Sequence, residues 1–390
     1  MYTLIEIFDA KQYENIITPV CLSQLTKVIY VGSKELMTGE RIESLKRFYH
    51  QIKFSIPTQF FYVERDNAQS IKNRLTQIVK SNHNCIFDAT GGEDVILTNV
   101  GVISERFSVP VIRIDTKTKK CIPVHGKALQ LSFKERALSV SDFITLEGGR
   151  ILLYDTVSTF TNEDVDILKA VFEVNSANCE AFSAFCNCVS EYLSDDGKTL
   201  SIDKSDFLKI TERSRFDIVK VLNLLIDKGL IEKTNEDENT SVYKTKSHIV
   251  SMCIKKSGNV LEYYTAIAAS SFGSLSDIRV GVSIEWDIST KHYETQNEID
   301  VMAISGGLPI FISCKNGEVR KEALYELDAV ARALGGTHAK KVLVCTYLSK
   351  NYNSREHLMK RARDMGIHLV FNTHKKSFDE FLHYLKIASA

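Results

Sequence analysis

The sequence predicts an α/β protein in which two α/β regions flank a helical one. The chain has 390 residues, which suggests two or three domains, and 44% of its residues are apolar, enough for sizeable cores. Strand and helix patterns alternate at both ends of the chain, whereas its middle reads as amphipathic helices followed by a hairpin. We therefore expect domains at residues 1–150, 151–250 and 251–390.

Residues 1–115 are expected to form a Rossmann-like parallel sheet with helices on both faces. Short β-branched and aromatic runs alternate with amphipathic segments, as is typical of βαβ units. Ligands of such sheets bind beyond the carboxyl ends of the strands, so the loops after the first and fourth strands are candidate binding loops. Strands are expected at residues 4–8, 27–31, 60–63, 85–87 and 111–114, and helices at 15–22, 34–51, 67–80 and 93–107.

The two candidate loops are Asp9–Asn15 and Asp88–Asp94. The second places Gly91-Gly92 at a helix start, where backbone N–H groups can receive a phosphate. On spacing alone, a tight strand-to-helix turn with an ordinary cap explains these glycines better. The loop matches neither the GxGxxG fingerprint nor the P-loop, and no ribose-binding acid follows the first strand at the expected offset. These absences exclude a dinucleotide-dependent oxidoreductase.

Residues 151–250 are predicted to form a winged-helix-like connector. Residues 214–228 place apolar side chains at helical spacing, and a hairpin with a polar tip follows at residues 230–244. Two helices and a hairpin suit either DNA binding or the connection of domains. The region carries 11 Lys and Arg against 18 Asp and Glu, and this excess of acid favours a connector or dimer-packing module.

The strongest candidate for chemistry is the stretch Asn297–Lys315, NEIDVMAISGGLPIFISCK, which reads as a β-hairpin with its two glycines in the turn. Because side chains alternate along a strand, Glu298 and Asp300 share one face of the first strand. Ser313 and Lys315 share one face of the second strand for the same reason. Folding about the glycines sets Asp300 opposite Ser313.

These residue types suit metal-assisted hydrolysis of a phosphodiester. Carboxylate oxygens hold Mg²⁺ or Mn²⁺, the metal activates a water, and a lysine orients that water or stabilises charge. A third carboxylate, Glu262, lies upstream in an apolar helical run. Short Asp and Lys patterns are individually weak signals, so a half-buried hairpin with solvated charges is the competing interpretation. Trp286, Tyr293 and Tyr325 are candidates for stacking on unpaired bases, although core packing is favoured for Trp286.

A helix with Glu262, a strand with Asp300 and a following strand with Lys315 resemble the core of the PD-(D/E)xK nucleases. The usual acid of that family, two residues before the lysine, is Ser313 here. Serine is a poor metal ligand, so Glu262 or Glu298 supplies the missing charge, or metal affinity is low. The catalytic and metal-binding residues that the resemblance implies are Glu262, Glu298, Asp300, Ser313, Lys315 and, through its backbone carbonyl, Cys314.

The segment IFDATGGED, residues 86–94, resembles the x-N-x-T-G-G-x-K loop of CARF domains, the sensors of cyclic oligoadenylates in type III CRISPR defence. A CARF-like domain followed by a PD-(D/E)xK core is similar to the Card/Can-type ancillary nucleases over nearly the whole chain. The resemblance implies activation by cyclic tetra-adenylate and a homodimer whose two-fold axis matches the ring. It also implies cleavage of single-stranded DNA or RNA, or nicking of duplex DNA. The implied activator-binding residues are Asp9, Lys11, Gln12, Asn15, Asp88, Thr90, Gly91, Gly92 and Glu93.

Composition limits the remaining choices. Nine cysteines, an odd number without a CxxC pair, favour a reduced cytosol. The sequence has neither an apolar run of membrane-spanning length nor a secretory signal pattern, so we expect a cytoplasmic protein without a membrane partner. The rival function is a cyclic-nucleotide-responsive winged-helix transcription regulator with a degenerate, non-catalytic nuclease domain. Ser313 is the feature in favour of this rival, and the acidic middle region is the feature against it.

Overall fold

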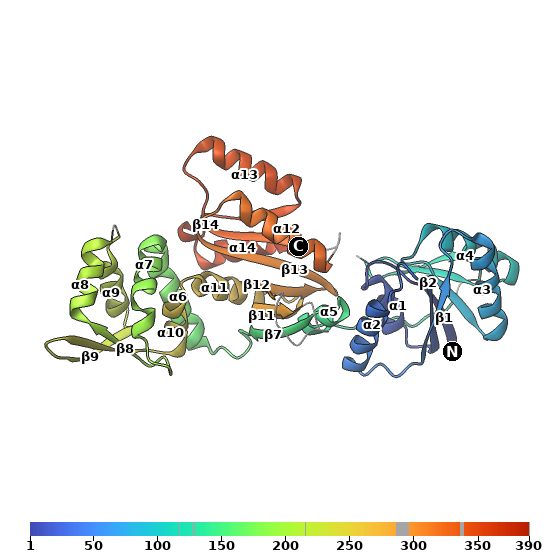
Figure 1. Ribbon diagram of the computed structural model, residues 1–390, viewed down its shortest axis with the longest axis horizontal. Coiled ribbons are helices and arrows are strands. Elements are labelled where there is room, and N and C mark those ends of the chain that lie inside the picture. Colours follow the sequence, from blue (N-terminus) through green and yellow to red (C-terminus); the bar gives the residue numbers. More distant parts are fainter. Residues whose placement is uncertain (117, 128, 215, 286–295, 336–338, 390) are drawn as a thin grey trace. The chain divides into compact units, whose positions relative to one another are not determined.

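The structure is a computed structural model that describes residues 1–390 except 117, 128, 215, 286–295, 336–338 and 390. The chain divides into two compact units, one formed mainly by residues 1–151 and the other by residues 152–284 and 296–390. Each unit contains a six-stranded sheet with helices against it, and the second unit also holds a three-stranded sheet (Figure 1). The predicted α/β class is therefore confirmed.

The first unit is a largely parallel sheet with helices on both faces. Its elements are β1 Tyr2–Ile7, α1 Glu14–Cys21, β2 Leu25–Ser33, α2 Gly39–Gln51, β3 Thr58–Val63, α3 Ala68–Ser81, β4 Cys85–Asp88, α4 Asp94–Phe107, β5 Val111–Ile114, β6 Cys121–His125 and α5 Val140–Leu146. The strand order is β3-β2-β1-β4-β5-β6, and only β6, at the edge, is antiparallel to its neighbour. Ile5 and Ile29 pack toward Ile71 of α3 and Ile96 of α4, whereas Tyr30 contacts Tyr49 of α2 through its hydroxyl.

Side-chain caps explain where several of these helices begin. The Thr38 hydroxyl accepts the Arg41 N–H before α2, and the Asn67 side chain accepts the Ser70 N–H before α3. Ser139 and Asp142 form a reciprocal capping box at the start of α5. By contrast, Glu93 precedes α4 without capping it, which leaves its carboxylate available for contacts of its own.

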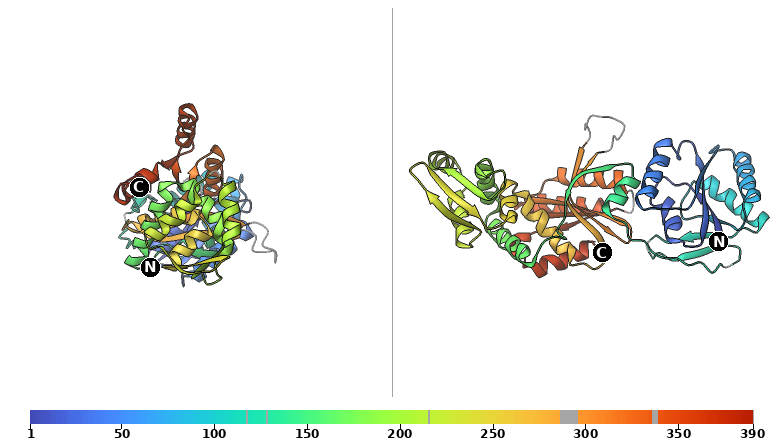
Figure 2. Two further views of the ribbon diagram at one scale, coloured as in Figure 1. Left: turned by 90° about the vertical axis from the view of Figure 1, so that its left-hand side faces the viewer. Right: turned by 90° about the horizontal axis from the view of Figure 1, so that it is seen from below.

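The second unit begins with a strand that joins its large sheet and continues into a winged-helix-like module. The elements are β7 Arg150–Asp155, α6 Asn162–Ala177, α7 Cys179–Val189, β8 Thr199–Asp203, α8 Lys204–Arg213, α9 Ile218–Asp227, β9 Ile231–Glu236 and β10 Thr240–Thr245. Strands β8, β10 and β9 form the small antiparallel sheet beside helices α8 and α9. Figure 2 shows this sheet, in yellow and green, at the end of the module farther from the large sheet.

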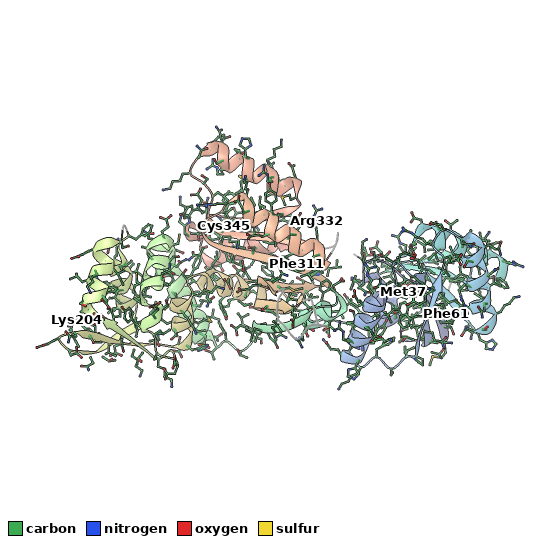
Figure 3. The ribbon with its side chains drawn as sticks, viewed as in Figure 1. Met37, Phe61, Lys204, Phe311, Arg332 and Cys345 are labelled. Atoms are coloured by element: carbon green, nitrogen blue, oxygen red, sulfur yellow. The ribbon has the colours of Figure 1, made fainter. Side chains whose placement is uncertain are left out.

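The large sheet of the second unit has the order β15-β14-β13-β12-β11-β7. Its further elements are α10 His248–Lys255, α11 Gly258–Ser270, β11 Leu275–Glu285, β12 Gln296–Ser305, β13 Leu308–Glu318, α12 Lys321–Gly335, β14 Lys340–Tyr347, α13 Tyr352–Asp364, β15 Ile367–Val370 and α14 Phe378–Ser389. Strands β12 and β13 are antiparallel, whereas β13, β14 and β15 run parallel. Phe311 of β13 and Cys345 of β14 are fully buried in this sheet (Figure 3).

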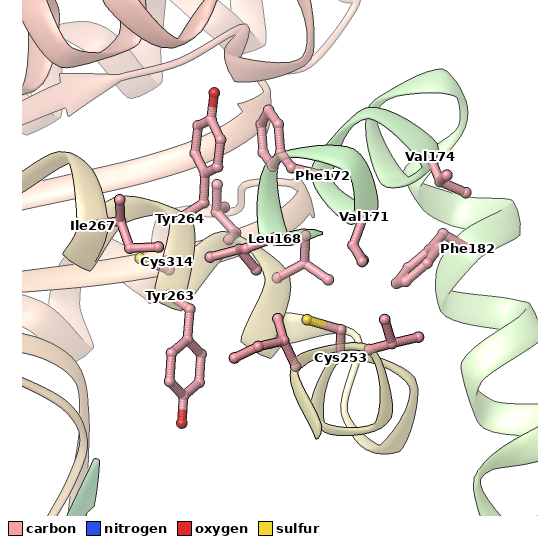
Figure 4. Close-up of a cluster of buried hydrophobic side chains, with 14 of the residues drawn as sticks. Leu168, Val171, Phe172, Val174, Phe182, Cys253, Tyr263, Tyr264, Ile267 and Cys314 are labelled. Carbon is pink, nitrogen blue, oxygen red and sulfur yellow. The ribbon is translucent and has the colours of Figure 1, made fainter. Parts of the chain in front are cut away.

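One hydrophobic core joins the helical module to the large sheet (Figure 4). Its aromatic centre is Tyr264 of α11, whose ring stacks on Phe172 of α6 with 3.7 Å between the ring centroids. Helix α11 is therefore held on one side by α6 and on the other by the sheet, where Cys314 lies. Most side chains of α11, including Glu262, are buried, so the shared core fixes the position of the helix that carries Glu262.

Candidate functional site

The two strands of the hairpin formed by β12 and β13 separate at Asp300. We call this place, with Asp300, Ser313, Cys314 and Lys315, the fork. The two strands turn through Gly306 and Gly307, both with positive φ, and pair as far as Val301 and Ile312. Asp300 is thereby set beside Ser313, as the alternation of side chains predicted. Beyond this pair, the Asp300 side chain, in place of the β12 backbone, forms the hydrogen bonds to β13. Its Oδ2 atom accepts the Cys314 N–H at 2.6 Å and the Ser313 hydroxyl at 3.1 Å.

Glu262 of α11 approaches the same fork and is only 4% exposed. Burial, and then the charge of Asp300, raise the pKa of Glu262 to about 7. Glu298 of β12 and Glu262 share a partner that sequence reasoning missed. The Lys256 Nζ atom lies 2.9 Å from Glu298 Oε1 and 3.7 Å from Glu262 Oε1. One feature of the sequence could have indicated Lys256: it is next to Ser257, directly before the helix that carries Glu262.

A small cavity of about 80 Å³ lies at the fork, and Lys315, Asp300 and Ser313 line it from the hairpin. Glu326 and Leu327 of α12 line its other side, and the sequence analysis did not single out either residue. One water occupies about 30 Å³ in the liquid, so the cavity has room for a small cation or a few waters. The structure thus brings Asp300, Ser313 and Lys315 together at one hollow, as expected.

The donor set at the fork fits a hard divalent cation in its chemistry. Glu262, Glu298 and Asp300 offer oxygen ligands, and the raised pKa of Glu262 reflects a buried carboxylate beside a second negative charge, which a cation would offset. Within the described ranges, however, no three acidic, His or Cys side chains already stand in a metal-binding arrangement.

Asn316, the residue after Lys315, ties this strand to the rest of the unit. Its side-chain amide forms a reciprocal pair with Asn175 of α6, with both N···O distances at 3.0 Å. It also accepts the Thr346 hydroxyl at 3.1 Å and donates to the Ser257 carbonyl at 3.4 Å. Asn175 is fully buried, whereas Asn316 is half-buried, so the network connects the interior of the unit to β13.

In the first unit, Asp9 joins the two candidate binding loops. Its carboxylate accepts the Gly92 N–H at 2.7 Å and the Lys11 N–H at 2.8 Å. The Gly92 N–H, one of the backbone groups that the sequence analysis named as able to receive a phosphate, is thus engaged within the protein by Asp9. The contact with an activator phosphate stays a prediction, and it requires Asp9 to release this donor.

The other predicted activator residues differ in how far they face solvent. Asp88, Asn15 and Gln12 are buried, so their side chains hold the loops in place. Asp88 accepts both the backbone N–H and the hydroxyl of Thr90, and Asn15 accepts the Asp9 N–H. Four of these residues are partly exposed: Lys11, Thr90, Gly92 and Glu93. Lys11 forms an ion pair with Glu14, and Glu93 forms one with Arg65. Gly91 is buried against Asp9 and Glu14.

Glu6 is a buried acid beneath these loops that sequence reasoning treated only as a strand residue. It is fully buried on β1, where it is paired in register with Asp88 of β4. Burial, and then the charge of Asp88, raise its pKa well above the ordinary value, and Asp9 and Glu14 act in the same direction. The sequence could have indicated the burial of Glu6, because a strand inside a parallel sheet is covered on both faces.

Replacing Glu6 with glutamine is expected to flatten the dependence of stability on pH. The unfolded carboxyl loses its proton above about pH 4.5, whereas the folded one retains it, so the wild type loses up to about 1.4 kcal/mol per pH unit as pH rises. Hydrogen exchange of the β1 and β4 amides in the full chain, from about pH 5 to about pH 8, measures this slope. E40Q, a change at an exposed glutamate of α2, is the control. Equal slopes in E6Q and the wild type would contradict the prediction.

Two of the expected stacking residues, Trp286 and Tyr293, lie outside the described residues. Tyr325 of α12 is 47% exposed, and the Arg361 guanidinium lies over its ring at 5.7 Å. Across the part of the chain that the structure describes, no helix is long and apolar enough to cross a membrane.

Comparison with known proteins supports the interpretation of the fork. Residues 254–387 match the family described as Card1-like, endonuclease domain. No curated protein matches the chain. Among solved structures, protein VC1899 from Vibrio cholerae has a TM-score of 0.75 at 16% identity, and the match covers 99% of this chain and 98% of that one. Can2 from Sulfobacillus thermosulfidooxidans, solved in complex with cyclic tetra-adenylate, has a TM-score of 0.69 at 13% identity and 99% coverage of both chains.

The structural matches and the sequence match support the same interpretation of the chain. The two structural likenesses extend over the whole chain, and both concern its fold. The sequence match covers the segment that contains Glu262, Asp300 and Lys315. Residues 254–387 thus resemble a Card1-like endonuclease domain, as the motifs of that region indicated, and the chain as a whole resembles Can2 in its fold.

Proposed function

We propose that this protein is a divalent-metal-dependent nuclease that cyclic tetra-adenylate activates. The observation that carries the proposal is the fork itself, where Asp300, Ser313 and Lys315 meet at one cavity inside a Card1-like endonuclease domain. Glu262 approaches from a separate helix, so the charged groups come from elements that the core holds rigidly. Single-stranded DNA or RNA is the favoured substrate, and nicking of duplex DNA is the alternative within the same chemistry.

Each residue of the fork has a defined part in this proposal. Asp300, with Glu262 or Glu298 and the Cys314 carbonyl, would hold Mg²⁺ or Mn²⁺, and the ion would supply an activated water and charge stabilisation. Ser313 orients the Asp300 carboxylate through its hydroxyl, which assigns the residue a positioning role in place of the family's usual acid. Lys315 offers an ammonium group to a phosphate oxygen or to the attacking water.

The first unit supplies the proposed control. The loops at Asp9–Asn15 and Asp88–Asp94 lie at the carboxyl ends of β1 and β4, the edge at which ligands of parallel sheets bind. Can2, whose fold this chain shares, was solved with cyclic tetra-adenylate, and this supports the same ligand here. A symmetric ring matches a two-fold axis, so we propose that a homodimer binds one ring and that binding favours the active arrangement.

The rival function keeps one observation in its favour. Ser313 occupies the position of the family's acid, so a degenerate nuclease that serves in a winged-helix transcription regulator is the second candidate. The acidic charge of residues 151–250 opposes binding of duplex DNA by the module.

The deciding experiment measures cleavage of labelled single-stranded DNA and RNA, with Mn²⁺ or Mg²⁺, in the presence and absence of cyclic tetra-adenylate. We expect cleavage only when metal and activator are both present. Absence of cleavage under every combination, together with tight activator binding and a duplex gel shift in chelator, would favour the regulator instead.

A further inference from the structure

Ser313 stands where the PD-(D/E)xK family has an acid, two residues before the lysine. Its hydroxyl is already engaged, because it donates to the Asp300 carboxylate at 3.1 Å. A neutral hydroxyl does not balance the charge of a divalent cation, which proteins usually hold with carboxylates. Asp300 is thus the acid of the fork, and a second carboxylate for an ion at the cavity has to come from another part of the chain.

The side of β13 on which Ser313 lies determines which element can supply this carboxylate. Along the strand, Ser313 and Lys315 share one face, and Cys314 points to the other. Cys314 meets α11, where its Sγ atom lies 3.6 Å from Thr265 Oγ1. Ser313 and Lys315 instead line the cavity of about 80 Å³ together with residues of α12. Helix α12 is therefore the element that faces the position of the family's acid.

Helix α12 brings one carboxylate to this cavity, that of Glu326. Leu327 and Val330 line the cavity beside it, and Val330 lies one turn after Glu326 on the same side of the helix. Leu327 is buried and holds the helix against the sheet, whereas Glu326 is exposed. Among the described residues, Glu326 forms no salt bridge, so its charge is not neutralised by a neighbouring cation.

The other acids near the fork are less available to an ion. Glu298 also lines the cavity, but the Lys256 Nζ atom lies 2.9 Å from its carboxylate. Glu262 is only 4% exposed, lies 3.7 Å from the same lysine and is not among the residues that line the cavity. An ion at Glu298 would compete with Lys256, whereas Glu326 has no such partner to release.

We propose that Glu326 takes the place of the family's acid and forms, with Asp300, the pair of carboxylates that holds Mg²⁺ or Mn²⁺ at the cavity. The inference rests on the proposed function and deepens it by naming the acid that position 313 lacks. Mg²⁺ is usually bound by one or two carboxylates, waters and substrate phosphates, so the site does not require three protein acids. Ser313 is then compatible with a functional nuclease and no longer favours the rival regulator.

The test measures Mn²⁺ binding directly and therefore does not depend on cleavage. The full chain, with cyclic tetra-adenylate present, is titrated with Mn²⁺, and the electron paramagnetic resonance signal of the free ion gives the dissociation constant. E326Q removes the charge and keeps the size of the side chain. The matched control is E322Q, because Glu322 is exposed one turn earlier on the same helix and does not line the cavity. The double variant S313E/E326Q moves the acid to the family's position.

E326Q is expected to bind Mn²⁺ at least about 10-fold more weakly than the wild type, since even an outer-shell partner of a metal ion contributes about 10- to 100-fold to affinity. E322Q is expected to bind like the wild type, and S313E/E326Q to recover the affinity. In cleavage assays, the Mn²⁺ concentration that gives half the maximal rate is expected to rise in E326Q.

Unchanged Mn²⁺ affinity in E326Q, together with a loss in D300N, overturns the role of Glu326 and leaves the proposed metal site standing. An effect of E322Q equal to that of E326Q also overturns it. Weaker Mn²⁺ binding by E326Q alone, when the wild type cleaves no nucleic acid, supports Glu326 as a ligand while the proposed hydrolysis fails. A wild type that binds no Mn²⁺ overturns both.

Discussion

Replacing Asp300 with asparagine is expected to lower nucleic-acid cleavage by at least about 10³-fold, because a charge that the transition state requires is lost. The amide oxygen of asparagine can still accept the Cys314 N–H, so the fork keeps its shape. Initial rates with Mn²⁺ and activator measure the loss, and binding of cyclic tetra-adenylate, which belongs to the other unit, is expected to stay unchanged. We expect Lys315→Ala to act in the same way.

The matched control for this variant is Asp227→Asn. Asp227 is an exposed aspartate at the end of α9, so the control makes the same chemical change in the same unit, away from the fork. Full cleavage activity in D300N would contradict the assignment of the site. A loss of activator binding in D300N would show instead that the substitution disturbs the fold.

Replacing Gly92 with alanine is expected to destabilise the first unit by about 3 kcal/mol and to abolish activator binding. Gly92 has a φ of +122°, which side-chain-bearing residues rarely adopt, and an added Cβ would lie 2.4 Å from Ile7 Cγ2. Ile7 is fully buried in β1, so it cannot move aside without disturbing the core. Calorimetric unfolding of the full chain measures the stability change, and titration calorimetry with cyclic tetra-adenylate measures the binding.

Gly101→Ala is the control for this prediction because it lies on the helix that follows the same loop. Nothing lies within 4 Å of a Cβ added at Gly101, which is exposed in α4. Alanine is therefore expected to stabilise the unit by about 0.5–1 kcal/mol. Wild-type stability and affinity in G92A would show that the loop has another conformation in solution.

The site could be predicted from sequence where the periodicity of strands and turns determines it. A two-residue Gly-Gly turn and the alternation of side chains were sufficient to set Asp300 beside Ser313. The boundaries of α3, α4 and β5 followed to within one residue from patterns within about fifteen residues, whereas β1, β2 and β3 begin two residues earlier than predicted.

Long-range contacts could not be predicted in this way. Lys256 meets Glu298 across 42 residues, and nothing in either segment specifies its partner. Strand β7 belongs to the large sheet of the second unit, although its sequence neighbours form the helical module. Likewise, engagement of the Gly92 N–H by Asp9 depends on how two loops 83 residues apart fold against each other.

The reciprocal amide pair between Asn175 and Asn316 has a mechanical consequence. Shifting α6 against β13 would break both hydrogen bonds at once and deprive the fully buried Asn175 amide of this partner, at a cost of about 1–3 kcal/mol. The two hydrogen bonds therefore couple α6 to the strand that carries Lys315. A displacement of α6 is therefore expected to reach the strand that carries Lys315 through this amide pair.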